Sequence, residues 1–157
     1  MGLALRMPKV RVIARDTDPR AQEFCRQMAE ANGVADRVQI GGEVTAAGLA
    51  ALIEGRTAIL CDTEGAEEVL LDPAAAPGLL AADVLVEVHE GMKVGRVDLL
   101  TRRFAPTHEV VRIERRLEDG GLPDWADGLG DLDRLLLLWE RRSTPTPWLW
   151  MRRRVTA

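Results

Sequence analysis

The sequence predicts a single α/β domain over residues 1–157, built in three layers around a mostly parallel sheet. Three observations predict this fold class. Short β-branched segments alternate with helical patterns along the chain, as in α/β proteins. Several of the apolar segments end abruptly in carboxylates, which is typical of buried parallel strands that end at a ligand-binding edge. A length of 157 residues is enough for one hydrophobic core.

Local signals set the element boundaries. Asp18 followed by Pro19 is a good helix start, because the carboxylate caps free N–H groups and proline suits the first helical position. Gly33 is a fitting stop for the same helix. In chain order, the expected elements are a strand at 10–14, a helix at 19–32, a strand at 38–40, a helix from Thr45 to Gly55, a strand at 57–61, helical turns at 66–72 and 74–81, a strand at 83–89, a helix at 94–104, a strand at 108–113, a loop at 120–130, a helix at 131–142 and a final strand at 148–151. The helix at 131–142 is expected to be capped by Asp131, with Leu132, Leu135, Leu136 and Trp139 on its apolar side. The final strand is the candidate for antiparallel direction.

Composition excludes several function classes. The net charge of −4 argues against a global basic field that recruits nucleic acid or an anionic membrane. Residues 148–154 combine tryptophans and arginines, but the alternation fits a packed strand and a solvated end better than base stacking. Cys25 and Cys61 lack metal-like spacing, which favours reduced thiols and a cytoplasmic protein. No apolar run approaches the roughly 18 residues of a membrane span, and Met1–Pro8 does not resemble a signal peptide.

Asp16 ends the first expected strand. An acid at this point of a strand–helix–strand unit can accept hydrogen bonds from both ribose hydroxyls of a nucleoside cofactor. The alternative is that Asp16 and Asp18 only cap the following helix. We expect Asp18 to be the cap and Asp16 the binding residue.

Three carboxylates follow the strand at 57–61, namely Asp62, Glu64 and Glu67. Acids this close repel each other unless a cation or hydrogen-bond donors share the site. A substrate ammonium, a sulfonium cofactor or a divalent metal would each relieve the repulsion. The alternative is that Glu67 and Glu68 are solvated acids in a first helical turn, which explains Asp62 poorly. Gly65 is expected to permit a positive φ or a close backbone approach.

Glu87 and His89 end the strand at 83–89. If this strand lies beside the one at 57–61, both side chains meet Asp62 at one edge of the sheet. A carboxylate and an imidazole together can deprotonate a hydroxyl or bind a metal. The alternative is a hydrogen-bonded structural histidine, which is the expected role of His108.

The segment Asp62-Thr63-Glu64-Gly65-Ala66-Glu67 matches the Asp-x-Glu-Gly-x-Glu pattern of FkbM-like S-adenosylmethionine-dependent methyltransferases, and the chain as a whole is similar to the class I methyltransferase fold. The resemblance implies methyl transfer from S-adenosylmethionine to a hydroxyl oxygen of a small molecule or sugar. It implies that Asp16 holds the ribose, that Gly42 lies near the adenine, and that Asp62 and Glu64 face the cofactor or acceptor. His89 or Glu87 would assist deprotonation.

The chain departs from the family at its front, where no first strand and no glycine-rich loop precede Asp16. Met1–Pro8 resembles the last turns of the helix that follows that loop, so we expect an amino-terminally truncated domain, with S-adenosylmethionine as the cofactor if the loop is supplied. The rival hypothesis is a non-catalytic binding or dimerisation module whose open sheet pairs with a second chain. A divalent metal shared by Asp62 and Glu87 stays an open option.

Overall fold

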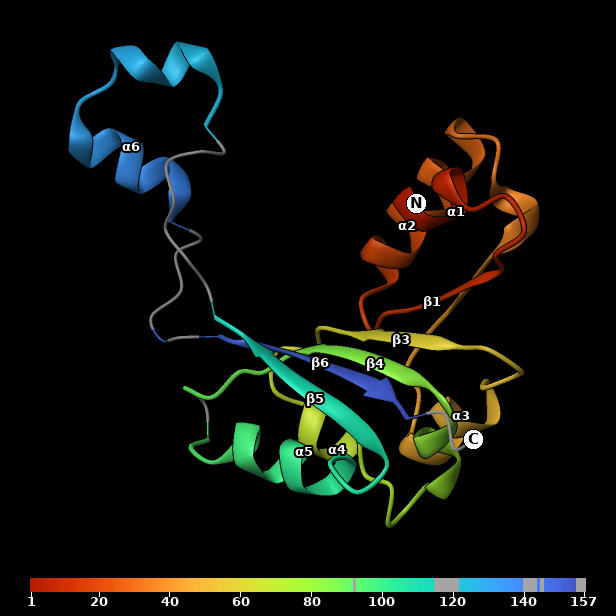
Figure 1. Ribbon diagram of the computed structural model, residues 1–157. Coiled ribbons are helices and arrows are strands. Elements are labelled where there is room, and N and C mark those ends of the chain that lie inside the picture. Colours follow the sequence, from red (N-terminus) through yellow and green to blue (C-terminus); the bar gives the residue numbers. More distant parts are fainter. Residues whose placement is uncertain (92, 115–121, 140–143, 145, 155–157) are drawn as a thin grey trace. The chain divides into compact units, whose positions relative to one another are not determined.

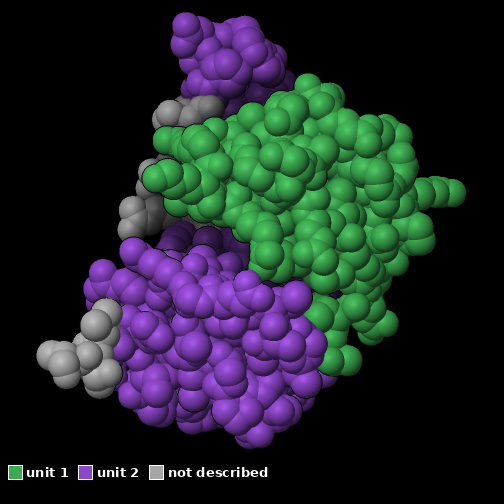
Figure 2. Space-filling view, turned by 90° about the vertical axis from the view of Figure 1, so that its right-hand side faces the viewer, with its two compact units in different colours: residues 1–45 green, residues 46–157 purple. Residues whose placement is uncertain are grey.

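The chain divides into two compact units, residues 1–45 and residues 46–157 (Figures 1 and 2). The computed structural model describes residues 1–91, 93–114, 122–139, 144 and 146–154. Each unit is described by itself below, and the single domain expected from the sequence stays a prediction. No helix in the described ranges is long and apolar enough to cross a membrane.

The first unit is built around two parallel strands and a long helix. The Asp18 carboxylate accepts a hydrogen bond from Arg20 N at 2.8 Å, and Pro19 is the first helical residue, so the predicted helix start is confirmed. Gly33 has a φ of 64°, which lets the chain turn after the helix. The elements are α1 (Gly2–Arg6), β1 (Val12–Arg15), α2 (Pro19–Ala31), the 3₁₀ turn η1 (Ala35–Arg37) and β2 (Val38–Gly41), with β1 and β2 parallel from the pair Val12↔Val38 to the pair Arg15↔Gly41.

The second unit contains a four-stranded sheet with the strand order β3-β4-β6-β5. Strands β3 and β4 are parallel, and β6 runs antiparallel to both of its neighbours, β4 and β5, as expected for the last strand. The elements are α3 (Ala46–Ala51), β3 (Ala58–Cys61), α4 (Glu67–Leu70), the 3₁₀ turn η2 (Pro77–Ala81), β4 (Asp83–Glu87), α5 (Arg96–Phe104), β5 (His108–Ile113), the 3₁₀ turn η4 (Asp124–Gly128), α6 (Asp131–Leu138) and β6 (Trp148–Arg153).

One face of this sheet carries the core. Alternate residues of a strand point to opposite faces, and the buried set belongs to one of them. Helices α4 and α5 lie on one side of the sheet in Figure 1. On the other face, Leu60, Leu85, Trp150 and Val111 form a row of register neighbours, and Leu60 is 63% exposed. The buried residues of the core include Ile59, Cys61, Leu71, Leu79, Val84, Val86, Leu100, Phe104, Leu149 and Met151.

The structure corrects three boundary predictions. Helix α3 ends at Ala51, not at Gly55, and the expected loop at 120–130 contains the 3₁₀ turn η4. Gly130, not Asp131, is the N-cap residue of α6, and no side-chain hydrogen bond caps this helix. Helix α6 ends at Leu138, with Trp139 as its C-cap residue, and residues 140–142 of the predicted helix lie outside the described residues. The leucines of its predicted apolar side are about half exposed or more: Leu132, Leu135 and Leu136 are 70%, 51% and 50% exposed.

Candidate functional site

Parallel pairing of β3 and β4 brings the carboxyl ends of both strands to one edge of the sheet. Cys61, the last residue of β3, is the register partner of Val86 in β4. Asp62 therefore follows β3 beside the point where Glu87 and His89 follow Val86. One ligand atom each of Asp62, Glu87 and His89 lies within 4.8 Å of the others. The predicted meeting of these three side chains is confirmed.

His89 is the centre of a group of acids that we call the acid–histidine cluster: Asp62, Glu64, Glu67, Glu87 and His89. The imidazole is only 5% exposed. Its Nδ1 lies 2.6 Å from Glu67 Oε1, and its Nε2 lies 3.0 Å from Glu64 Oε2 and 3.9 Å from Asp62 Oδ1. Neutral imidazole can donate through one nitrogen only, whereas imidazolium donates through both. Each ring nitrogen of His89 faces a carboxylate oxygen, Glu67 on one side and Glu64 on the other.

Glu67 is the residue that holds the ring in place. It is fully buried, and its Oε1 also accepts a hydrogen bond from Gly65 N at 2.9 Å. The alternative of a solvated helix acid is wrong for Glu67, because its side chain is fully buried against His89. The resemblance assigned roles to Asp62 and Glu64 but none to Glu67. The available signal was its place as the last acid of the Asp-x-Glu-Gly-x-Glu pattern.

The turn between β3 and α4 depends on two left-handed residues. Glu64 has a φ of 49° and Gly65 a φ of 116°, so the predicted positive φ of Gly65 is confirmed. Only glycine adopts the second of these values readily. The turn folds Gly65 N back onto Glu67 and presents Glu64 to the imidazole. The glycine in the motif is thus explained by backbone geometry.

Arg96, at the start of α5, supplies the positive charge closest to Glu67. It is 9% exposed, and its Nη1 donates to the carbonyl oxygen of His89 at 3.0 Å. The same nitrogen lies 3.7 Å from Glu67 Oε2, and Arg96 Nε lies 3.6 Å from Glu68 Oε2. Among the described residues, neither Glu67 Oε2 nor Arg96 Nε has a hydrogen-bond partner. No motif or spacing in the sequence singles out Arg96.

Two neighbouring groups have shifted acidities. Burial raises the pKa of the Cys61 thiol to about 11, with smaller contributions from the charges of Glu67 and Asp62. A hydrogen bond from Lys93 lowers the pKa of Glu68, with Lys93 Nζ 2.6 Å from Glu68 Oε1. Glu68 was expected to be a solvated acid of the first helical turn; it lies in that turn but is paired with Lys93 and is 24% exposed. Cys61 is a neutral thiol next to the cluster.

The cluster has the donor types that a divalent cation accepts, namely carboxylate oxygens and one imidazole nitrogen. In the structure, however, both ring nitrogens of His89 lie within hydrogen-bond distance of carboxylates. A cation on Nε2 would have to displace Glu64, whose side chain is 77% exposed and free to turn away.

Asp16 and Gly42 lie together in the first unit, at the carboxyl ends of β1 and β2. Asp16 Oδ1 accepts a hydrogen bond from Asp18 N at 2.8 Å, and the Asp16 carbonyl accepts one from Gln22 Nε2. Asp16 thus shapes the turn into α2, and Oδ2 is the oxygen that a ribose hydroxyl could reach. A hollow of about 110 Å³ adjoins it, lined by Ala14, Gln22 and Ile40 among others. A side chain at Gly42 would make ordinary contact with Gln22, so packing does not demand glycine there.

His108 has the structural role that was expected. It is fully buried, its Nε2 lies 2.9 Å from the carbonyl oxygen of Ala82, and its ring packs edge-on against Phe104 at 5.2 Å. It has no carboxylate partner among the described residues, in contrast to His89.

Two solved methyltransferase structures are similar to this chain. The putative precorrin-6Y C5,15-methyltransferase targeted domain from Corynebacterium diphtheriae matches with a TM-score of 0.57 and 12% identity, over 98% of this chain and 81% of that chain. The O-methyltransferase from Bacillus cereus in complex with SAH matches with a TM-score of 0.52 and 12% identity, over 92% of this chain and 63% of that one. The chain has a Rossmann-like methyltransferase fold.

A third match is cofactor-bound Rv0187 from MTB, with a TM-score of 0.53 and 16% identity, over 94% of this chain and 64% of that chain. The chain therefore spans less than two thirds of the Bacillus cereus and MTB proteins. No protein-family model and no curated protein matches the sequence. Identities of 12–16% establish the fold and leave the activity to be argued from the site.

Proposed function

We propose that this chain is an FkbM-like, S-adenosylmethionine-dependent methyltransferase that methylates a hydroxyl oxygen of a small molecule or sugar. The observation that carries the proposal is His89, held by Glu67 and facing Asp62 and Glu64 at the carboxyl edge of β3 and β4. Ligands of open α/β sheets bind at that edge. The methyltransferase fold and the SAH complex of one neighbour support S-adenosylmethionine as the cofactor.

The residues of the cluster have distinct roles in this proposal. When bound, the cofactor supplies an electrophilic methyl group. His89 Nε2 takes the proton of the acceptor hydroxyl, while Glu67 fixes the ring through Nδ1 and stabilises the positive charge that forms. Glu87, 2% exposed, adds a second buried carboxylate beside the ring. Asp62 and Glu64 are exposed and face the cofactor or acceptor.

The cofactor part of the proposal rests on Asp16, Gly42, Asp62 and Glu64. Asp16 Oδ1 accepts one hydrogen bond from Asp18 N, and the remaining acceptor sites of the two carboxylate oxygens are enough for both ribose hydroxyls. Placing the acceptor against the methyl group matters more for this reaction than strong acid–base chemistry.

Titration calorimetry with S-adenosylmethionine tests the proposal on the full chain. We expect saturable binding that Asp16→Ala weakens about tenfold, as for loss of a hydrogen bond to a charged group. Asp36→Ala is the matched control, because Asp36 is an equally exposed acid of the same unit. If S-adenosylmethionine does not bind, or if both variants bind it equally well, the cofactor assignment fails.

A second candidate function is a non-catalytic dimerisation module. Two observations favour it. The apolar row Leu60–Leu85–Trp150–Val111 lies on the sheet face opposite the core, and Leu60 is largely exposed. Strand β3 is an edge strand that pairs with only one strand in the described part of the chain. In this candidate, a second copy of the chain covers the row. Sedimentation of the full chain over a range of concentrations decides: a dimer that Leu60→Lys dissociates supports the module, and a monomer at all concentrations rejects it.

A further inference from the structure

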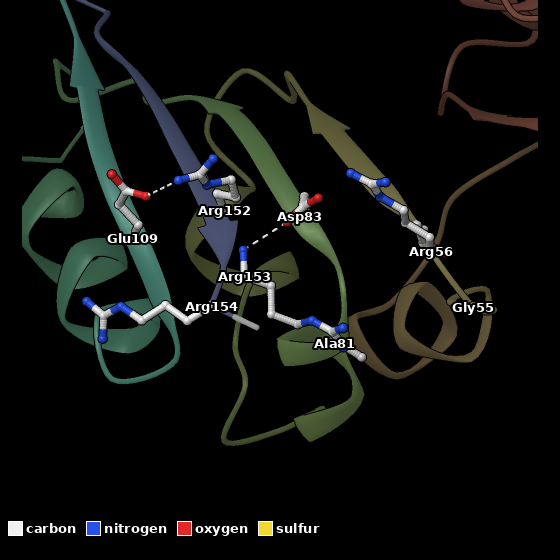
Figure 3. Close-up of a pocket in the computed structure, with 9 residues that line it drawn as sticks. Gly55, Arg56, Ala81, Asp83, Glu109, Arg152, Arg153 and Arg154 are labelled. Carbon is white, nitrogen blue, oxygen red and sulfur yellow. Dashed lines mark hydrogen bonds and ion pairs between the residues drawn. The ribbon is translucent and has the colours of Figure 1, made fainter. Parts of the chain in front are cut away.

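A hollow of about 720 Å³ lies at the opposite edge of the four-stranded sheet from the acid–histidine cluster (Figure 3). Its lining comes from the segment before β3, the first residue of β4, the start of β5 and the end of β6, so the amino ends of three strands meet there. Asp62 and His89 lie beyond the other ends of β3 and β4. The hollow is therefore separate from the proposed methyl-transfer site. We call it the arginine hollow, after Arg56, Arg152, Arg153 and Arg154, which line it together with Asp83 and Glu109.

The charges in the arginine hollow are not balanced. Four guanidinium groups face two carboxylates, which leaves a local excess of two positive charges on a chain whose net charge is −4. Both carboxylates are engaged already: Glu109 Oε2 lies 2.6 Å from Arg152 Nη2, and Asp83 Oδ1 accepts the backbone N–H of Arg153 at 2.8 Å. Figure 3 marks both contacts.

Three of the arginines have no carboxylate partner in the described part of the chain, namely Arg56, Arg153 and Arg154. In Figure 3, the side chains of Arg153 and Arg154 leave the end of β6 in opposite directions, and Arg56 lies across β4 from them. These three side chains therefore supply unused hydrogen-bond donors around the hollow.

The geometry points to the arginine hollow as a binding site for a small molecule that carries two or more phosphate charges. Guanidinium groups bind phosphate through paired N–H donors, with more geometric specificity than an ammonium offers. A volume of about 720 Å³ falls within the usual range for small-ligand sites, roughly 300–1,000 Å³. The local excess of positive charge matches a ligand with at least two negative charges.

A nucleic acid fits this site less well. Binding to a phosphate backbone requires a basic stripe along the surface, and its affinity grows with the number of phosphates contacted. Here the arginines surround one hollow, and the net charge of −4 repels a long polyanion at a distance. Trp148 and Trp150 of β6 are half-buried within the sheet and do not form a stacking platform at the hollow.

The test is calorimetric titration of the full chain with inorganic pyrophosphate. We expect saturable binding, and a loss of roughly tenfold in affinity for each of Arg56→Gln and Arg153→Gln, because each removes one charged donor. Arg102→Gln, on the exposed side of α5, is the matched control and should leave the affinity unchanged. Glu109→Gln should strengthen binding severalfold, because it releases Arg152 from its carboxylate partner.

These results separate the possible outcomes. A site is supported if the arginine variants weaken binding and Glu109→Gln strengthens it. The proposal fails if pyrophosphate does not saturate, or if Arg102→Gln weakens binding as much as the other two. It also fails if a single-stranded oligonucleotide binds through Arg56 and Arg153 while pyrophosphate does not bind. All the substituted arginines are exposed, and the circular dichroism spectrum of each variant verifies that it is folded.

Discussion

The charged side chains at the two edges of the four-stranded sheet differ in their exposure to solvent. At the acid–histidine cluster, the hydrogen-bonded side chains of His89 and Glu67 are 6% and 0% exposed. At the arginine hollow, the paired side chains of Arg152 and Glu109 are 63% and 54% exposed. Water can replace a lost partner at the second edge but not at the first. Buried charges therefore fix one geometry, whereas exposed charges can rearrange around a ligand.

The largest effect should come from removing the buried acid. Glu67→Ala leaves Gly65 N and His89 Nδ1 without their acceptor and Arg96 without its nearest buried carboxylate. We expect the free energy of unfolding to fall by about 3–5 kcal/mol, as for other broken buried pairs. Urea denaturation followed by circular dichroism measures it. Glu67→Gln retains an acceptor oxygen and should lose less, and equal losses in both variants would contradict the hydrogen-bonded role of Glu67.

A pH effect of intermediate size should come from Cys61. The folded-state pKa is about 11 and the ordinary value is 9.0, so the folded chain holds the thiol proton more tightly than the unfolded chain. This stabilisation is fully present below pH 9 and is lost as the pH rises toward 11. Its upper size is about 2–3 kcal/mol, from a shift of roughly two pKa units. Denaturation at pH 8 and pH 10.5 should show a smaller alkaline loss in Cys61→Ala than in the native chain. Parallel losses in the two proteins would mean that the thiol is not responsible.

The smallest effect should come from the exposed pair. Glu109→Ala removes the partner of Arg152, and we expect a change of about 0.2–1 kcal/mol in the free energy of unfolding, since exposed ion pairs contribute little. Repeating the measurement in 1 M NaCl should abolish even this difference, because the Debye length is then only about 3 Å. A loss as large as that of Glu67→Ala would remove the contrast between the two edges.

The strands were predictable because their signal is local. Residues 108–113 alternate in character, and the structure places β5 over the same residues, His108–Ile113. The meeting of Asp62, Glu87 and His89 was predictable as well, since parallel neighbours end at one edge. Helix α6 shows the limit of this reasoning: its leucine spacing predicted a buried face, and the leucines are exposed. A periodic pattern identifies an apolar face but not the surface that covers it.

The sequence by itself determined the order of the strands and helices along the chain, the left-handed turn at Gly65 and the position of the acids that follow β3 and β4. These features are local, because backbone propensity and hydrophobic period act over a few residues. Only the tertiary structure decided that Glu67 is buried against His89, that Arg96 accompanies it, and that Arg56 shares a hollow with Arg152, Arg153 and Arg154. His89 and Glu67 are 22 positions apart in the sequence, and Arg154 and Arg56 are 98 positions apart. Burial and charge pairing at such separations depend on how strands and helices pack, and no local pattern in the sequence records that.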